Sequence, residues 1–251
     1  MKITFLGTGT STGNPQLLCK CRTCMSKNPK DIRLRTSVFV ETDGSSILLD
    51  CGPDFRQQVF RENIRKIDAV VLSHEHYDHV SGMDDLRPFC TYTEMPVYAY
   101  PRVLEKMKIA MPYSFSENPY PGIPVFKVNP VLDKPFFIGD TEVTPVEVLH
   151  YKLPVLGVRI GEMAYITDFN SIRQSEIDKL QGLKVMIVDA LRREPHLSHN
   201  TLGQTLDLIR AVKPEQSWLI HMSHDMGLFD EVNPTLPEGV QLAWDGLKIE
   251  I

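Results

Sequence analysis

Three histidines and one aspartate crowd the stretch HEHYDH, directly after the apolar run DAVVLS, although the whole chain has only 8 histidines. Side chains alternate in an extended chain, so His74 and His76 should point the same way from the end of this strand. Asp78 and His79 follow in the turn before a helix that we expect to begin near Val80. Burying so many imidazoles without partners is unfavourable, whereas a metal ion satisfies them. The spacing therefore predicts a metal-binding site rather than a solvated polar loop.

The stretch HEHYDH resembles the metal-binding signature of the metallo-β-lactamase superfamily. The resemblance implies an α/β fold, the αββα four-layer sandwich, and a hydrolase with two divalent metals in its active site. Further ligands must then come from later strand ends, including a carboxylate able to bridge. His150 closes VTPVEVLH, Asp168 closes MAYITD and His221 closes QSWLIH, each where a predicted strand gives way to a loop. Each alone is typical of a capping or surface residue, but together, in the family's order, they indicate ligands.

The resemblance implies a role for each of these residues. His74, His76 and His150 would hold one metal, Asp78, His79 and His221 the other, and Asp168 would bridge the two. Asp50, which ends SILLD, matches an early aspartate of the family that orients the ligand loop. Penicillin-degrading members commonly have cysteine where this chain has Asp168, so antibiotic hydrolysis is disfavoured. Zinc, manganese and iron all suit a site built of imidazoles and carboxylates.

The elements that must position these residues follow from the apolar pattern. Short runs rich in Val, Ile, Phe and Tyr predict strands, namely KITFLG, SVFVE, SILLD, AVVLS, PVYAY, EVTPVEV, VLGVRI, MAYITD, KVMIVD, SWLIH and LKIEI. Helix-like segments lie between them at 53–63, 81–88, 101–110, 172–181 and 200–213, the last with Asn200 and Thr201 as caps. The hairpin pattern of SVFVETDGSSILLD argues against a purely parallel sheet and favours two packed sheets with helices outside.

A second metal site is predicted at Cys19, Cys21 and Cys24, which lie together in LLCKCRTCMS. Three thiolates this close need one more ligand for the tetrahedral closure of a structural zinc. In HMSHD, His224 follows His221 by three residues and is free to turn elsewhere, so we expect it to be the fourth ligand. Three reduced loop cysteines without a metal are the alternative.

The cysteine loop and the late histidine together resemble a narrower family, the phosphoribosyl cyclic phosphodiesterases of the carbon–phosphorus lyase pathway of phosphonate breakdown. The resemblance runs over almost the whole chain, from GTGTSTG to the closing GVQLAWDGLKIEI. It implies a dinuclear metal-dependent phosphodiesterase that hydrolyses a small phosphodiester, such as a cyclic ribose phosphate, with a metal-bridging hydroxide. A homodimer and a role in phosphonate metabolism are expectations from this resemblance alone.

The charges at the predicted centre favour an anionic substrate. Two divalent ions, the Asp78 and Asp168 carboxylates and a bridging hydroxide leave about one net positive charge, which suits in-line displacement at phosphorus. The leaving alkoxide needs a proton, which a histidine supplies near neutral pH. His199 matches the family's histidine between the bridging aspartate and the last metal histidine, which favours it over His196 as the catalytic group. Asp78 would share in proton handling, and a surface histidine near a helix cap is the alternative for His199.

Composition limits the remaining choices of domain organisation, binding partner and cellular location. With 42% hydrophobic and 24% charged residues, the chain should form one compact metallo-β-lactamase-type domain over 1–251, with its cysteine-rich loop at about 17–27. The net charge of −5 and the lack of a basic stripe disfavour nucleic-acid binding, and no run approaches the roughly 18 apolar residues of a membrane span. The start MKITFLGTGTSTG lacks a signal-peptide pattern, and five cysteines without one indicate metal binding in the reducing cytoplasm.

Other functions stay open from the sequence. The transfer-RNA 3′-end endonucleases of the superfamily share the ligands, but they usually add a long arm rich in Gly, Pro and basic residues, and no such insertion is present. Lactone and thioester hydrolases share the ligands but need no histidine that faces phosphate. A zinc-binding or redox module without hydrolase activity would leave the strand-end ligands without a purpose. The sequence assigns no role to His196, Cys51 or Cys90.

Overall fold

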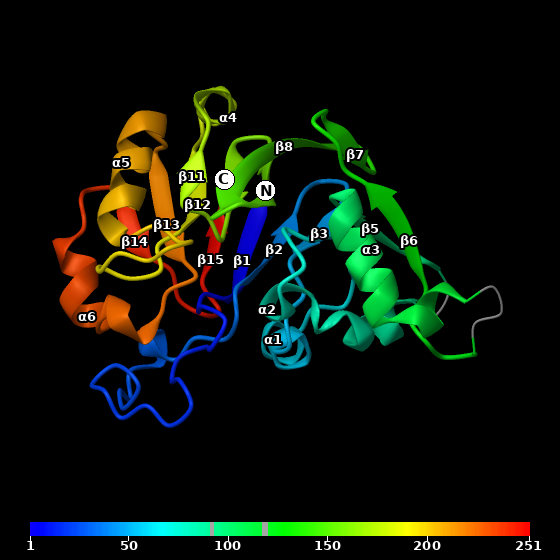
Figure 1. The fold of residues 1–251 in the computed structure, drawn as a ribbon, viewed down its shortest axis with the longest axis horizontal. Helices are drawn as coiled ribbons and strands as arrows, with labels where there is room; N and C mark the ends of the chain where they lie inside the picture. Colours follow the sequence, from blue (N-terminus) through cyan, green and yellow to red (C-terminus); the bar gives the residue numbers. More distant parts are fainter. Residues whose placement is uncertain (91–92, 117–119) are drawn as a thin grey trace.

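A computed structural model describes residues 1–90, 93–116 and 120–251. Two β-sheets pack face to face, and helices cover the outer face of each, which gives four layers (Figure 1). The apolar core follows the same layers. One buried cluster fills the space between the sheets, and one further cluster lies beneath the helices on each outer face. The αββα sandwich that the sequence predicted is therefore confirmed.

The first sheet has the strand order β15–β1–β2–β3–β4–β5–β6. Its strands are β1 (Lys2–Gly7), β2 (Ser37–Glu41), β3 (Ser46–Leu49), β4 (Ala69–Val71), β5 (Met95–Ala99), β6 (Phe126–Pro130) and β15 (Lys248–Glu250). Strands β2 and β3 form the predicted hairpin, whereas β3, β4, β5 and β6 run parallel. The parallel pair β3 and β4 brings Asp50 and the HEHYDH stretch to one edge of the sheet, because both follow the carboxyl ends of their strands.

The second sheet has the order β11–β8–β9–β10–β12–β13–β14, with β7 paired to β8. Its strands are β7 (Phe136–Ile138), β8 (Thr141–His150), β9 (Leu153–Ile160), β10 (Met163–Ile166), β11 (Ser171–Ile172), β12 (Val185–Asp189), β13 (Gln216–Ile220) and β14 (Val240–Leu242). Strands β10, β12 and β13 are parallel neighbours, so their carboxyl ends lie side by side. The sequence did not predict β6, β7, β11 or β14, which are short strands at sheet edges.

Helices on the first sheet are α1 (Phe55–Glu62), α2 (Tyr77–Val80), α3 (Pro101–Ala110) and the 3₁₀ segments η2 (Met83–Cys90) and η3 (Pro112–Phe115). The second sheet carries α4 (Gln174–Asp178), α5 (Leu202–Val212) and α6 (Phe229–Val232), and shorter 3₁₀ turns are η1 (Pro29–Asp31), η4 (His224–Met226) and η5 (Asn233–Thr235). Figure 1 shows α1 and α3 on one flank and α5 and α6 on the other. Among the described residues, none of the helices is long and apolar enough to cross a lipid bilayer.

Helix α5 begins where the sequence placed its cap. The Thr201 hydroxyl accepts a hydrogen bond from the Gln204 backbone N–H at 3.2 Å, and the Gln204 side chain accepts one from the Thr201 N–H at 2.9 Å. This reciprocal pair is a capping box, which satisfies two otherwise free donors of the first turn. The cap fixes the start of α5. It thereby helps to fix His199 and Asn200, which directly precede Thr201.

Candidate metal centre

The HEHYDH segment leaves β4 and turns into a helix earlier than predicted. Helix α2 begins at Tyr77 rather than near Val80, so Asp78 and His79 lie within it. This segment packs closely on the chain that follows β3. A Cβ atom on Gly52 would lie only 2.0 Å from the Asp78 carbonyl oxygen, so only glycine lets the two backbones approach this closely. The contact directs Asp78 and His79 into the space between the sheets.

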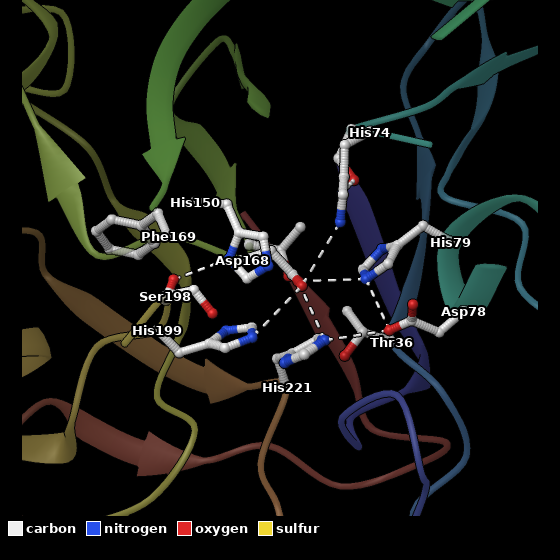
Figure 2. A network of polar contacts seen from close by, with 12 residues as sticks. Thr36, His74, Asp78, His79, His150, Asp168, Phe169, Ser198, His199 and His221 are labelled. Atoms are coloured by element: carbon white, nitrogen blue, oxygen red, sulfur yellow. Dashed lines mark hydrogen bonds and ion pairs between the residues drawn. The ribbon is translucent and has the colours of Figure 1, made fainter. Parts of the chain in front are cut away.

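The Asp168 carboxylate lies at the centre of the predicted ligands (Figure 2). Its oxygens are 3.7 Å from His74 Nε2, 3.2 Å from His79 Nε2 and 3.1 Å from His221 Nε2. The Asp78 carboxylate lies 3.2 Å from the same His79 nitrogen and 3.5 Å from that of His221. Four ligand atoms, from Asp78, His79, Asp168 and His221, are therefore close enough together to share one ion.

A second group of ligand atoms comes from His74, His76 and Asp168. Asp168 belongs to both groups, which is the position expected of a bridging carboxylate. The His150 ring lies 5.2 Å from the His76 ring and 5.8 Å from the His74 ring, and its nearest ligand group contains Asp168 and His199. His76 is the one exposed residue of the seven. The structure thus brings all seven residues together, and their roles as ligands stay a prediction.

The buried nitrogens at the centre fit a metal ion. His74, His79 and His221 are almost completely buried, and the Nε2 atom of each makes no hydrogen bond to the described part of the chain. Buried ring nitrogens in proteins normally have a hydrogen-bond partner, so three that face one carboxylate without a hydrogen bond are suited to bind a metal ion. Imidazole and carboxylate together are a donor set that zinc, manganese and iron accept. The residues present therefore fit divalent metals.

The electrostatics of the centre also favour cations. Burial alone would raise the pKa of Asp168, but the neighbouring His221 and His79 rings hold it well below its usual range. Burial opposes ionisation of Asp78 as well, and His79 and His221 again lower its pKa. Burial lowers the pKa of His74, which keeps that ring neutral and its lone pair available. The site thus combines two ionised carboxylates and an unprotonated His74 ring with the rings of His79 and His221, whose pKa values Asp168 raises against the effect of burial.

Asp50 lies behind the candidate ligands and accepts hydrogen bonds from three separate segments of the chain. One of its oxygens accepts hydrogen bonds from His79 Nδ1 at 2.7 Å, the Ser73 hydroxyl at 2.8 Å and the Tyr165 hydroxyl at 2.8 Å. The other oxygen accepts from the Ser73 backbone N–H at 2.7 Å. These contacts fix the His79 ring with Nε2 toward Asp168, as expected for a residue that orients the ligand loop.

Asp189 is a site residue that the sequence reasoning missed. It ends β12, is completely buried, and accepts a hydrogen bond from His199 Nδ1 at 3.0 Å. Its other oxygen lies 3.9 Å from His221 Nδ1. The His199 ring therefore presents Nε2 to the centre, 4.0 Å from the Asp168 carboxylate. A signal existed, because Asp189 closes KVMIVD just as Asp50 closes SILLD.

Asn170 is a second missed residue, and it joins two loops beside the centre. Its side-chain oxygen accepts from the Tyr151 backbone N–H, and its side-chain N–H donates to the Leu197 carbonyl, both at 2.8 Å. His150 Nδ1 donates to the Ser198 carbonyl oxygen at 2.8 Å (Figure 2). The turn that follows His150 is thus tied to the loop that precedes His199, and no pattern in the sequence marks Asn170 for this role.

Three of these strand ends have left-handed backbone. The φ angles are 60° at Asp50, 49° at Asp168 and 56° at His221. A residue with a Cβ atom adopts this conformation at a cost of roughly 1–2 kcal/mol. The sharp turn that results aims each side chain away from its strand and toward the centre.

The cysteine loop forms a second ligand cluster with His224. Its Nδ1 atom lies 3.3 Å from Cys19 Sγ and 3.2 Å from Cys21 Sγ, and Cys24 completes a group that can hold one metal. Burial would raise the pKa of Cys21, but the Cys24 backbone N–H and the His224 ring lower it to about 6. A thiolate is therefore present near neutral pH. Three sulfurs and one imidazole fit a tetrahedral zinc site.

Comparison with known proteins identifies the family of this chain. Residues 45–222 match the model of the β-lactamase superfamily domain. A solved structure described as a new diphosphatase from the PhnP family is 38% identical, superposes with a TM-score of 0.92, and aligns over 99% of this chain and 96% of its own. The chain belongs to the PhnP family of the β-lactamase superfamily. Residues 45–222 accordingly form a domain of the metal-dependent hydrolase type.

Two further proteins resemble this PhnP-family chain. A protein of Porphyromonas gingivalis named octanoyltransferase is 44% identical over 251 residues, which are 99% of this chain and 51% of that protein. The chain thus spans about half the length of this relative. The Zn²⁺-bound PqqB of Methylobacterium extorquens has a TM-score of 0.81 at 18% identity, over the full length of both chains. At that identity the likeness shows the shared fold alone.

Asp50→Asn is expected to reduce hydrolysis by this PhnP-family chain roughly 10- to 100-fold, the usual effect of removing a group that orients a metal ligand. Asparagine tolerates the left-handed backbone at this position, but its amide would place N–H groups against the donors of His79, Ser73 or Tyr165. Turnover and bound metal per chain measure the effect. Tyr165→Phe, which removes only one donor, should cause the smaller loss, and equal losses would contradict the orienting role.

His224→Ala is expected to remove one zinc per chain and to lower the melting temperature by roughly 5–10 °C, because a structural zinc contributes directly to folding. Zinc content and thermal unfolding are the measurements. Asp225→Ala changes the adjacent residue without removing a cysteine-loop ligand and serves as the control. A His224→Ala protein with full zinc content and an unchanged melting temperature would exclude His224 as the fourth ligand.

Proposed function

We propose that the chain hydrolyses a small phosphodiester at a dinuclear metal centre. The pairing of His199 with Asp189 beside a shared carboxylate, Asp168, carries the proposal. Carboxyl-ester hydrolysis at such a centre would need no buried carboxylate behind a second histidine. A His–Asp pair is the arrangement that supplies a proton to a poor leaving group.

The metals would be held by two ligand groups that share one residue. His74, His76 and His150 would hold one ion, Asp78, His79 and His221 would hold the other, and Asp168 would serve both; in the structure His150 lies beside Asp168 and His199. Bound divalent ions would lower the pKa of a water molecule and neutralise the phosphate oxygens. Zinc and manganese are the ions we propose, because a site of histidines and carboxylates accepts either.

The chain's own residues would handle the protons. A water oxygen forms a new P–O bond while the P–O bond to the leaving oxygen breaks, and His199 transfers its Nε2 proton to that oxygen. The Asp189 carboxylate, which accepts from Nδ1 at 3.0 Å, would hold the His199 ring with Nε2 toward the leaving oxygen. Asp78, ionised and about 10% exposed at its side chain, would take part in removing the proton from water. The products are a phosphomonoester and an alcohol.

The comparisons support chemistry at phosphorus. The PhnP-family structure that is 38% identical over nearly the whole chain is described as a diphosphatase, and diphosphate hydrolysis also displaces an oxygen from phosphorus. A nucleotide polymer is disfavoured as substrate because the chain carries a net charge of −5. We therefore infer a small phosphodiester.

The test is hydrolysis of bis(p-nitrophenyl) phosphate by metal-replete protein, with a lactone and a β-lactam in parallel. We expect turnover of the diester alone, its loss after chelation, and its return when zinc or manganese is added back. Turnover of the lactone without the diester would replace the proposal with carboxyl-ester chemistry. Diester turnover that survives complete removal of metal would contradict the dinuclear centre.

A further inference from the structure

The loop between Arg192 and Ser198 has a shape fixed by its own contacts. The Arg192 guanidinium donates to the carbonyl oxygens of Glu194 at 3.2 Å and Pro195 at 2.8 Å. The Asn170 side chain holds the loop from the other side through the Leu197 carbonyl. The exposed side chains of the loop are therefore presented at set positions next to His199.

His196 has a defined tautomer within this loop. The Ser198 backbone N–H donates to His196 Nδ1 at 3.3 Å, so Nδ1 carries the lone pair and Nε2 carries the proton. The imidazole is exposed, and in the described ranges only Ser198 hydrogen-bonds to it. Its ring centroid lies 5.1 Å from that of His199. Nε2–H is thus a neutral donor available beside the catalytic histidine.

The two neighbouring histidines are suited to different tasks. His199 donates its Nδ1–H to the Asp189 carboxylate, which leaves Nε2 facing the centre for proton transfer. His196 accepts the Ser198 backbone N–H at Nδ1, which leaves its Nε2–H free to donate a hydrogen bond. An uncharged donor of this kind recognises an oxygen with free lone pairs, such as a hydroxyl group.

The leaving group must occupy the side of the centre where His196 lies. Under the proposed function, His199 protonates the leaving oxygen, so the leaving alcohol extends past His199. Tyr151 and Leu197 also lie at this side, with 51% and 72% of their surfaces exposed, and Asn170 fixes the backbone of both. We call Tyr151, His196 and Leu197 the rim. It combines one directed donor with exposed apolar surface.

We propose that His196 is a specificity-determining residue, whose Nε2–H donates a hydrogen bond to a hydroxyl group on the leaving alcohol. The hydrogen bond would favour a leaving alcohol with a free hydroxyl group over the same alcohol without one. The inference rests on the proposed phosphodiesterase function and extends it to the choice of leaving group.

Two cyclic phosphates that differ by one hydroxyl test the role. Glycerol 1,2-cyclic phosphate carries a free hydroxyl that propane-1,2-diol cyclic phosphate lacks, and ³¹P NMR follows ring opening of both. His196→Ala should raise KM for the glycerol compound about tenfold, the effect of one lost neutral hydrogen bond, and leave kcat and the propanediol constants within about twofold. His196→Gln keeps a side-chain N–H donor and should restore part of the loss. Glu194→Ala, on the same loop, is the control.

The possible outcomes distinguish a failure of this inference from a failure of the proposed phosphodiesterase function. Equal losses on both substrates would assign His196 a structural or general catalytic role and overturn the inference. Unchanged constants in His196→Ala would overturn it as well. If wild-type protein opens both rings with the same kcat/KM, the rim does not recognise the hydroxyl group and the inference is wrong. If wild-type protein opens neither ring and hydrolyses no diester, the phosphodiesterase proposal fails and takes the inference with it.

Discussion

Asp168→Asn should lower kcat/KM for a phosphodiester by about 10³- to 10⁴-fold, since several kcal/mol of charge stabilisation depend on this carboxylate. Asp168 is the residue shared by both ligand groups, and His74, His79 and His221 all face it. A neutral amide has one acceptor oxygen and carries no charge, so it cannot bridge two cations. Asparagine is nearly isosteric and accepts the left-handed backbone, so the fold should be retained.

Two measurements decide the Asp168 prediction together. Turnover gives the loss of rate, and metal analysis of the purified protein gives ions bound per chain, which should fall below the wild-type number. Asp133→Asn removes a carboxylate from an exposed position and should change neither quantity. A fully metallated Asp168→Asn protein with wild-type turnover would remove Asp168 from the centre.

His199→Ala should give a loss that depends on the leaving group. For an alkyl phosphodiester, whose alkoxide must be protonated, kcat should fall by about 10²- to 10⁴-fold, the range of general acid catalysis. For a p-nitrophenyl ester, whose leaving group departs without a proton, the loss should be less than about tenfold by the same reasoning. Comparing kcat on the two esters measures the difference, and Asp189→Asn should show the same pattern to a smaller degree.

Metal content separates the two roles open to His199. Its ring lies within ligand distance of His150 and Asp168, so it could bind an ion instead of moving a proton. A proton donor can be removed without losing metal, and the His199→Ala protein should keep its full complement. Loss of an ion together with equal rate losses on both esters would instead make His199 a ligand.

The positions of the candidate ligands could be predicted because each follows a readable strand. His150, Asp168 and His221 come directly at or after apolar runs of β-branched and aromatic residues, and such runs locate strand ends well. Neighbouring parallel strands place their carboxyl ends at one edge, which brings β10, β12 and β13 together. Local patterns in the sequence were therefore enough to predict that candidate ligands far apart in the chain lie close together.

Features decided by tertiary contact could not be predicted. The edge strands β6 and β14 contain FKVNP and VQL, whose polar residues hide the strand pattern, and pairing with one neighbour forms them. The close approach of α2 to the chain after β3 requires glycine at position 52, which is distant from α2 in sequence. Asn170 acts through two backbone groups on separate loops, and only the folded chain brings those groups within its reach.

The left-handed backbone at Asp168 and His221 has a consequence for selection. Glycine adopts this conformation without strain, and asparagine adopts it more readily than most residues, so either substitution would relieve part of the local cost. A library of variants screened only for thermal resistance without metal should therefore enrich glycine or asparagine at these two positions. Such variants would unfold at a higher temperature than the parent and would hydrolyse substrate far more slowly. Aspartate at position 168 and histidine at position 221 would be kept only when variants are selected for turnover.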